Sequence, residues 1–148
     1  MKDILLMFLA FVAVADAMPA AFGQSKVKMK VVVSPRANNN NPVAVDLVLV
    51  KDKKLLKELM KISAGEWFER RNQYRADFPK EVGLDAGRWE GVPGQAVKIE
   101  PIPFKFKAAG GLVFANYFSP GAHRAVIDPG KPIVITLGVE GISVRPEK

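Results

Sequence analysis

The chain has 148 residues, 49% of them hydrophobic, and a formal net charge of +7, so it is large and apolar enough to fold around one packed core. It contains no cysteine, which excludes disulfides, thiolate zinc sites and a cysteine nucleophile. Its basic residues are scattered, and the densest runs, 51–57 and 70–75, are broken by other residue types and are typical of a solvated face.

The N-terminal segment has the pattern of an export signal. Residues 4–14 form an unbroken apolar run, followed by small-residue cleavage patterns at 15–17 and 21–23. A run of about 11 residues is too short to cross a bilayer, which takes about 20, but it fits the apolar region of a secretory signal. We expect residues 1–23 to be a signal peptide, the alternative being a buried N-terminal helix. N-terminal sequencing of the protein from its native host distinguishes the two.

Two strands and a loop are predicted at the start of the mature chain. Residues 27–34 alternate apolar residues with lysine and then become β-branched, which is typical of a strand that runs from an exposed end into a core. Pro35 ends this strand, and residues 36–41 favour a loop because asparagine tolerates a left-handed backbone. Residues 42–50 follow as a second strand, with Pro42 at its first position, where the missing N–H donor does little harm.

A pair of helices is predicted at residues 53–78. Four apolar residues are spaced for one helical face: Leu55, Leu56, Leu59 and Ile62. Ser63 and Glu66 have the spacing of a capping box, so a second helix is expected from Ala64 to about Asp77. The buried side of this helix is expected to carry Trp67, Phe68, Tyr74 and Phe78. Because predicted strands flank the helix pair, we interpret it as an insertion after the second strand.

The rest of the chain is predicted to be rich in strands. Residues 80–94, with four glycines, are expected to be irregular, and residues 110–111 to form a turn. Further strands are expected at 96–107, 112–118, 124–127, 132–139 and 142–144. Pro101 and Pro103 indicate that the first of these is either an edge strand or a split one. The total of about seven strands predicts a mainly β fold, a single β-sandwich domain over residues 24–148.

The residue types that carry catalysis or bind metals form no constellation. His123 is the only histidine, and we expect it at the surface in a turn beside Arg124, without the orienting partner and nucleophile that a catalytic histidine needs. The carboxylates are separated, and no glycine-rich phosphate loop follows a strand. Residues 67–75 interleave aromatic and basic side chains, as single-strand nucleic-acid sites do, but the aromatics are also spaced as core residues. We therefore expect no enzyme activity, cofactor, metal or nucleic-acid partner.

The order of these elements resembles the outer-membrane lipoprotein of type VI secretion systems, the TssJ family. The segments that carry the resemblance are residues 31–50, 54–78, 112–126 and 133–144. They match the family's Asn/Pro-rich first hairpin, its helical insertion, its late aromatic strand pair and its closing hairpin. The resemblance implies a transthyretin-like β-sandwich with a two-helix insertion after the second strand. His123 stands where the family has tryptophan, and the sequence lacks the lipidated cysteine that family members carry after the signal.

The resemblance also implies a function. Family members are non-catalytic periplasmic subunits of a secretion apparatus, and the loop between their first two strands contacts the periplasmic domain of the large inner-membrane subunit. Carried over, the partner-binding residues are Pro35, Arg36, Asn38, Asn39, Asn40 and Asn41. We expect Arg36 to be the strongest contact, since arginine is enriched among interface hot spots. Deletion of residues 38–40 is expected to weaken binding with little loss of thermal stability.

The resemblance places the protein in the periplasm, at the outer membrane, with membrane association only through partners or an unseen anchor. Two alternatives stay open at this point. The loop at 35–41 could be a solvated turn with no partner. The chain could also be a secreted ligand- or peptide-binding β-sandwich, which needs an aromatic-lined pocket such as one formed by Trp89, Phe104 and Phe106.

Overall fold

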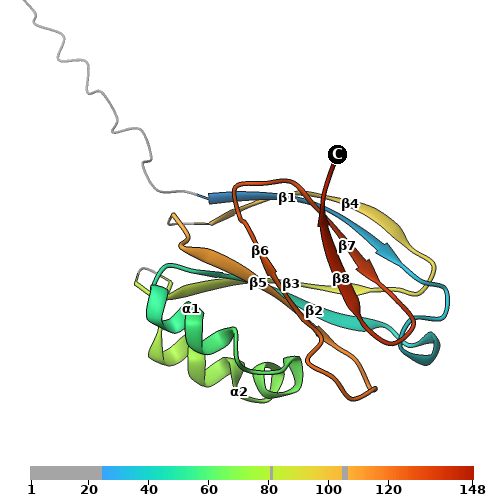
Figure 1. Cartoon of the computed structure of the whole chain (residues 1–148), viewed down its shortest axis with the longest axis horizontal. Coiled ribbons are helices and arrows are strands. Elements are labelled where there is room, and N and C mark those ends of the chain that lie inside the picture. The colour runs from blue at the N-terminus through green and yellow to red at the C-terminus, as the bar shows by residue number, and fades with distance from the viewer. Residues whose placement is uncertain (1–24, 81, 105–106) are drawn as a thin grey trace, which may run out of the picture.

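Two four-stranded sheets packed face to face form the body of the molecule, and two helices lie against one of them (Figure 1). The computed structural model describes residues 25–80, 82–104 and 107–148. The expected signal peptide at residues 1–23 lies outside the described residues, and so does Phe106.

The strand order places β1 and β2 at the centres of different sheets. Sheet A has the order β4-β1-β7-β8, with strands β4 (Ala96–Phe104), β1 (Ser25–Val33), β7 (Ile133–Leu137) and β8 (Ile142–Pro146). Sheet B has the order β3-β2-β5-β6, with strands β3 (Leu84–Gly91), β2 (Val43–Val50), β5 (Gly110–Asn116) and β6 (Arg124–Ile127). Among the described strands, β1 and β7 pair in parallel, and the other neighbours pair antiparallel.

The central strands of sheet B are buried on both faces. In β2, Val45 and Leu47 pack in the core between the sheets, whereas Val48 and Val50 pack in a second core beneath the helices. Strand β5 divides its side chains between the same two cores. Burial on both faces explains why β2 and β5 read as nearly continuous apolar runs rather than alternating ones.

The helix pair lies between β2 and β3 in the chain, as predicted. Helix α1 (Lys53–Leu59) is capped by the side chain of Asp52, which accepts a hydrogen bond from the Leu55 N–H at 2.8 Å. Helix α2 (Ala64–Asp77) begins with the predicted capping box, in which Ser63 Oγ accepts from the Glu66 N–H and Glu66 Oε2 accepts from the Ser63 N–H. The backbone hydrogen bond from Ser63 is the main cause that lowers the pKa of Glu66.

The prediction of an irregular segment at residues 80–94 is wrong, because β3 occupies much of it. This strand pairs with β2 over its whole length, from Leu84 opposite Val50 to Gly91 opposite Val43. Its own composition argues against a strand, since glycine and acidic residues are depleted in sheets. The pairing with the buried strand β2 therefore outweighs the low strand propensity of these residues.

The prediction of a turn at residues 110–111 is also wrong, because both glycines lie in β5. A Cβ added at Gly111 would lie 2.8 Å from the Leu49 side chain and 2.9 Å from that of Ile127, so the tight packing there leaves no room for a side chain. With β3 included, the sandwich has eight strands where about seven were expected. The placement of Pro101 and Pro103 on an edge strand is confirmed, since β4 ends sheet A.

Candidate partner-binding site

The turn between β1 and β2 has an unusual left-handed backbone. A short 3-10 turn, η1 (Ala37–Asn40), connects the sheets, and Asn38, Asn39 and Asn40 have φ angles of 50°, 54° and 61°. Such angles cost L-residues roughly 1–2 kcal/mol each, and asparagine is among the few types that adopt them routinely. The asparagine run thus fits the backbone, and contacts with the rest of the fold must hold it in place.

Asn38 supplies those contacts. Its side chain is 4% exposed, its Oδ1 accepts from the Phe118 N–H at 2.8 Å, and its Nδ2 donates to the Pro42 carbonyl at 3.3 Å. Its backbone N–H donates to the Val139 carbonyl at 3.0 Å. Asn38 therefore ties the β1–β2 turn to the loop after β5 and to the turn after β7. The expectation that residues 38–40 can be deleted with little loss of stability is not supported by these bonds.

The remaining predicted site residues are exposed: Pro35, Arg36, Asn39, Asn40 and Asn41. Asn41 Nδ2 donates to the carbonyls of Asn38 and Asn39, which closes the turn on itself. The backbone N–H of Arg36 donates to Ser34 Oγ, but its guanidinium has no hydrogen bond or ion pair within the described residues. Arg36 is thus a cation presented to solvent at the tip of a rigid turn.

Two exposed apolar side chains beside this turn were missed by the sequence analysis. Phe118 is 72% exposed and Val139 is 41% exposed, and both residues bond to Asn38 through their backbones. Residues 112–118 were predicted as one strand, but β5 ends at Asn116, so Phe118 lies in a loop. The Ser-Pro-Gly that follows it is a turn signal that could have placed it there. We call Arg36, Asn39, Asn40, Phe118 and Val139 the turn surface.

The base of the turn surface is held by Tyr117 and His123. The Tyr117 hydroxyl donates towards the carbonyls of Gly138 and Gly141, at 2.9 and 3.1 Å, and burial raises the pKa of Tyr117 to about 12, so this proton is retained at neutral pH. The His123 ring stacks on Tyr117 with centroids 4.9 Å apart, and its Nε2 lies 2.8 Å from the Ser119 carbonyl. His123 is therefore half-buried and packed rather than simply at the surface, and together these contacts order the loop that carries Phe118.

The aromatic pocket required by the ligand-binding alternative does not form from the described residues. Phe104 is buried in the core between the sheets, and Trp89 packs against the same core at the open edge between β3 and β4. Trp89, Val31, Val97 and neighbours line a cavity of about 150 Å³. Ligand sites for drug-sized molecules are larger, at roughly 300–1,000 Å³. Within the described residues, no helix is long and apolar enough to cross a membrane, and no three His, Cys, Asp or Glu side chains group to hold a metal ion.

Solved structures from type VI secretion systems have this architecture. The T6SS lipoprotein TssJ1 from Pseudomonas aeruginosa superposes with a TM-score of 0.64 at 16% identity, over 84% of this chain and 97% of that one. The chain has the fold of the type VI secretion lipoproteins. Lip of Serratia marcescens, described as a membrane-bound component of the type VI secretion system, gives a TM-score of 0.61 at 17% identity, over 84% and 98% of the two chains. The predicted β-sandwich with a helix pair after the second strand is confirmed.

A third similar structure is described as the TssM C-terminal domain, residues 869–1107, from EAEC. Its matched chain gives a TM-score of 0.60 at 14% identity, over 83% of this chain and 99% of that one. The sequence itself matches no protein-family model and no curated protein.

Within this TssJ-type fold, Asn38→Ala is expected to lower the free energy of unfolding by about 1–3 kcal/mol, because it leaves the Phe118 N–H without its acceptor. Asn39→Ala is the matched control, since Asn39 has the same left-handed backbone but an exposed side chain. Asn39→Ala should lower the free energy of unfolding only by the amount that alanine disfavours a left-handed backbone relative to asparagine. Urea unfolding followed by tryptophan fluorescence measures both, and equal losses would contradict the anchoring role of Asn38.

Proposed function

We propose that this protein is a non-catalytic assembly subunit of a type VI secretion envelope complex, located in the periplasm. In this proposal the turn surface binds the periplasmic domain of the large inner-membrane subunit. The observation that carries it is the combination of an exposed aromatic, Phe118, and an exposed arginine, Arg36, at one rigid end of the sandwich. Aromatic and arginine side chains are the types most enriched at the energetic centres of protein interfaces.

The rigidity of the turn surface favours binding. Ordering a mobile loop on association lowers affinity, and a loop held in place beforehand avoids that cost. Here the loops that carry Arg36 and Phe118 are joined to each other through Asn38, and the Phe118 loop is joined to the β7–β8 turn through Tyr117. Because the Phe118 ring is exposed and held in an ordered loop, a partner that covers it would bury a large apolar area.

The comparisons support the choice of partner. A structure described as a TssM C-terminal domain contains a chain that matches this one in fold. The two other similar structures are described as a T6SS lipoprotein and as a membrane-bound component of the type VI secretion system. A partner of the TssM type is therefore the first to test.

Binding to the periplasmic domain of the TssM-type subunit from the same organism tests this function. We expect Phe118→Ala and Arg36→Ala each to weaken the affinity by about 2 kcal/mol or more, roughly a 30-fold rise in Kd. Isothermal titration calorimetry measures the change. Because both side chains are exposed, the melting temperature of each variant should stay close to that of the unmodified protein.

Two matched controls sharpen this test. Val82→Ala removes an exposed apolar side chain away from the turn surface, and Arg70→Ala removes an exposed arginine from α2. Both controls should bind with unchanged affinity. Unchanged affinity for Phe118→Ala and Arg36→Ala would reject the turn surface, and a loss confined to Arg70→Ala would move the site to the helix pair.

A further inference from the structure

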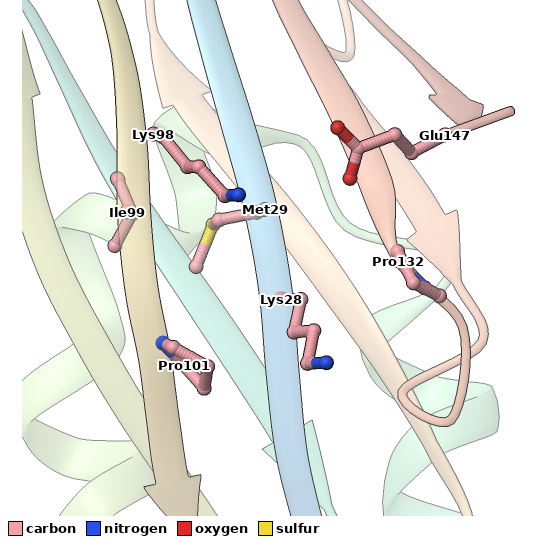
Figure 2. A pocket seen from close by; sticks show the side chains of 7 residues that line it. All are labelled: Lys28, Met29, Lys98, Ile99, Pro101, Pro132 and Glu147. Atoms are coloured by element: carbon pink, nitrogen blue, oxygen red, sulfur yellow. The ribbon is translucent and has the colours of Figure 1, made fainter.

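The outer face of sheet A carries an unbalanced group of cations. We call this group the lysine face; it comprises Lys26, Lys28, Lys30, Lys98 and Arg145. The lysines of β1 alternate with Val27, Met29 and Val31, which are buried between the sheets, so all three lysines project from the opposite side. Figure 2 shows Lys28 on β1 and Lys98 on the neighbouring β4, two of the residues that line a surface depression, with Glu147 beyond Lys28.

The strand register extends this face across all four strands of sheet A. Lys30 lies opposite Lys98 on one side and opposite Val134 of β7 on the other, and Val134 lies opposite Arg145 of β8. Val134 lies on the outer face, since its neighbours Ile133 and Ile135 pack in the core, yet it is only 4% exposed. The aliphatic stems of long basic side chains can cover such a residue and leave their charges in water. The result is a broad surface of positive charge, hollowed beside Lys28 and Lys98 by a depression of about 450 Å³.

Among the described residues, the charges of the lysine face have no acidic partners, and Arg145 Nη1 donates only to the carbonyl of Pro146, at 3.5 Å. Two described carboxylates border it: Glu147 beside Lys28 and Lys98, and Asp128, which lines a cavity with Arg145 but pairs with Lys131 at 3.5 Å. Of the large apolar residues that are exposed among the described residues, Val126 lines a cavity with Arg145 at the edge of the face, and Met60, Val82, Val92, Phe118 and Val139 lie on other elements. This face therefore has positive charge but no apolar anchor at its centre.

We propose that the lysine face docks on the anionic headgroups of a lipid bilayer. A specific protein partner would need an apolar centre to bind, and recognition of single carboxylates favours the planar fork of arginine. Lysine, as a hydrated point charge, suits the diffuse charge of a headgroup surface, and several lysines act together there. The face is the outer side of the sandwich layer away from the helices (Figure 1), and the turn surface lies at one end of the sandwich, so docking leaves the turn surface open. This inference does not depend on the proposed secretion partner.

Co-sedimentation of the whole protein with lipid vesicles tests the proposal. The vesicles are phosphatidylcholine alone or an equal mixture of phosphatidylcholine and phosphatidylglycerol. We expect binding to the anionic vesicles that is lost at high salt, because screening removes attraction between exposed charges. Replacement of Lys28, Lys30 and Lys98 by glutamine should lower the partition coefficient about 100-fold, since each lysine near an anionic surface contributes roughly fivefold.

The matched control replaces Lys53, Lys54 and Lys57 of α1 by glutamine. These side chains are exposed, they change the net charge by the same amount, and they lie on the helices away from the lysine face. This variant should bind anionic vesicles within a few-fold of the unmodified protein. Single replacements at Lys28 and at Lys98 repeat the test if the triple variant unfolds. Equal loss in both triple variants, equal binding to neutral vesicles, or preferential binding to polyglutamate over vesicles would overturn the proposal.

Discussion

Trp67→Ala is expected to lower the free energy of unfolding by about 3–5 kcal/mol, one of the largest losses that a single truncation can cause. The Trp67 ring is fully buried between α2 and sheet B. It stacks on Phe114 of β5 with centroids 5.1 Å apart and on Tyr74 of α2 at 5.8 Å. Removing it leaves a cavity in the core that attaches the helices to the sheet, and the rigid strands can close it only partly.

Urea unfolding measures this loss, and two further variants identify its source. Trp67→Phe keeps an aromatic ring but removes the indole N–H, so it should cost about 1–3 kcal/mol for the lost hydrogen bond. Val82→Ala truncates an exposed apolar side chain and should change the stability by under about 0.5 kcal/mol. A loss of under about 1 kcal/mol for Trp67→Ala would show that the ring does not anchor the helices.

Asp46→Ala is expected to lower the free energy of unfolding by about 3–5 kcal/mol, because the residue is the buried acceptor for two side chains of α2 at once. Asp46 lies on β2 and is buried, yet it projects to the helix side of sheet B. Its carboxylate accepts from Trp67 Nε1 at 2.9 Å and from Arg71 Nη1 at 3.1 Å. Arg88 Nε of β3 lies 3.9 Å away. Removing the carboxylate leaves the indole N–H and the Arg71 guanidinium with no acceptor there.

The matched control for Asp46 is Asp85→Ala, which removes another strand carboxylate with a basic partner. Asp85 pairs with the more exposed Lys80 at 3.4 Å. Because the Lys80 side chain is half-exposed and water competes for its ammonium, this pair contributes about 0–1 kcal/mol. Equal losses at Asp46 and Asp85 would contradict the role of Asp46 as a buried anchor. A double-mutant cycle between Asp46→Ala and Trp67→Phe should give a coupling energy of about 0.5–3 kcal/mol.

The features that the sequence by itself determined are those that depend on near neighbours along the chain. The capping box of Ser63 and Glu66 acts over three residues, so its spacing was enough to place the start of α2. Alternation of lysine with valine and methionine decided which side of β1 is buried. The prolines at 101 and 103, two residues apart, lack N–H donors toward the same side of the strand, so the sequence allowed only an edge strand or a split one, and β4 is an edge strand.

The tertiary structure decided the features that depend on distant contacts. Strand β3 forms despite its glycines because a buried β2 pairs with it along its whole length. The sequence predicted a loop at the asparagine run, but it could not distinguish Asn38 from Asn39. Asn38 Oδ1 accepts from the N–H of Phe118, 80 positions away, whereas the neighbouring Asn39 is exposed. Phe118 is exposed because β5 ends before it and none of the described elements covers the loop. Whether a side chain is buried depends on the elements that pack against it. Local sequence alone could therefore not assign Asn38 as the buried anchor or Phe118 as an exposed aromatic.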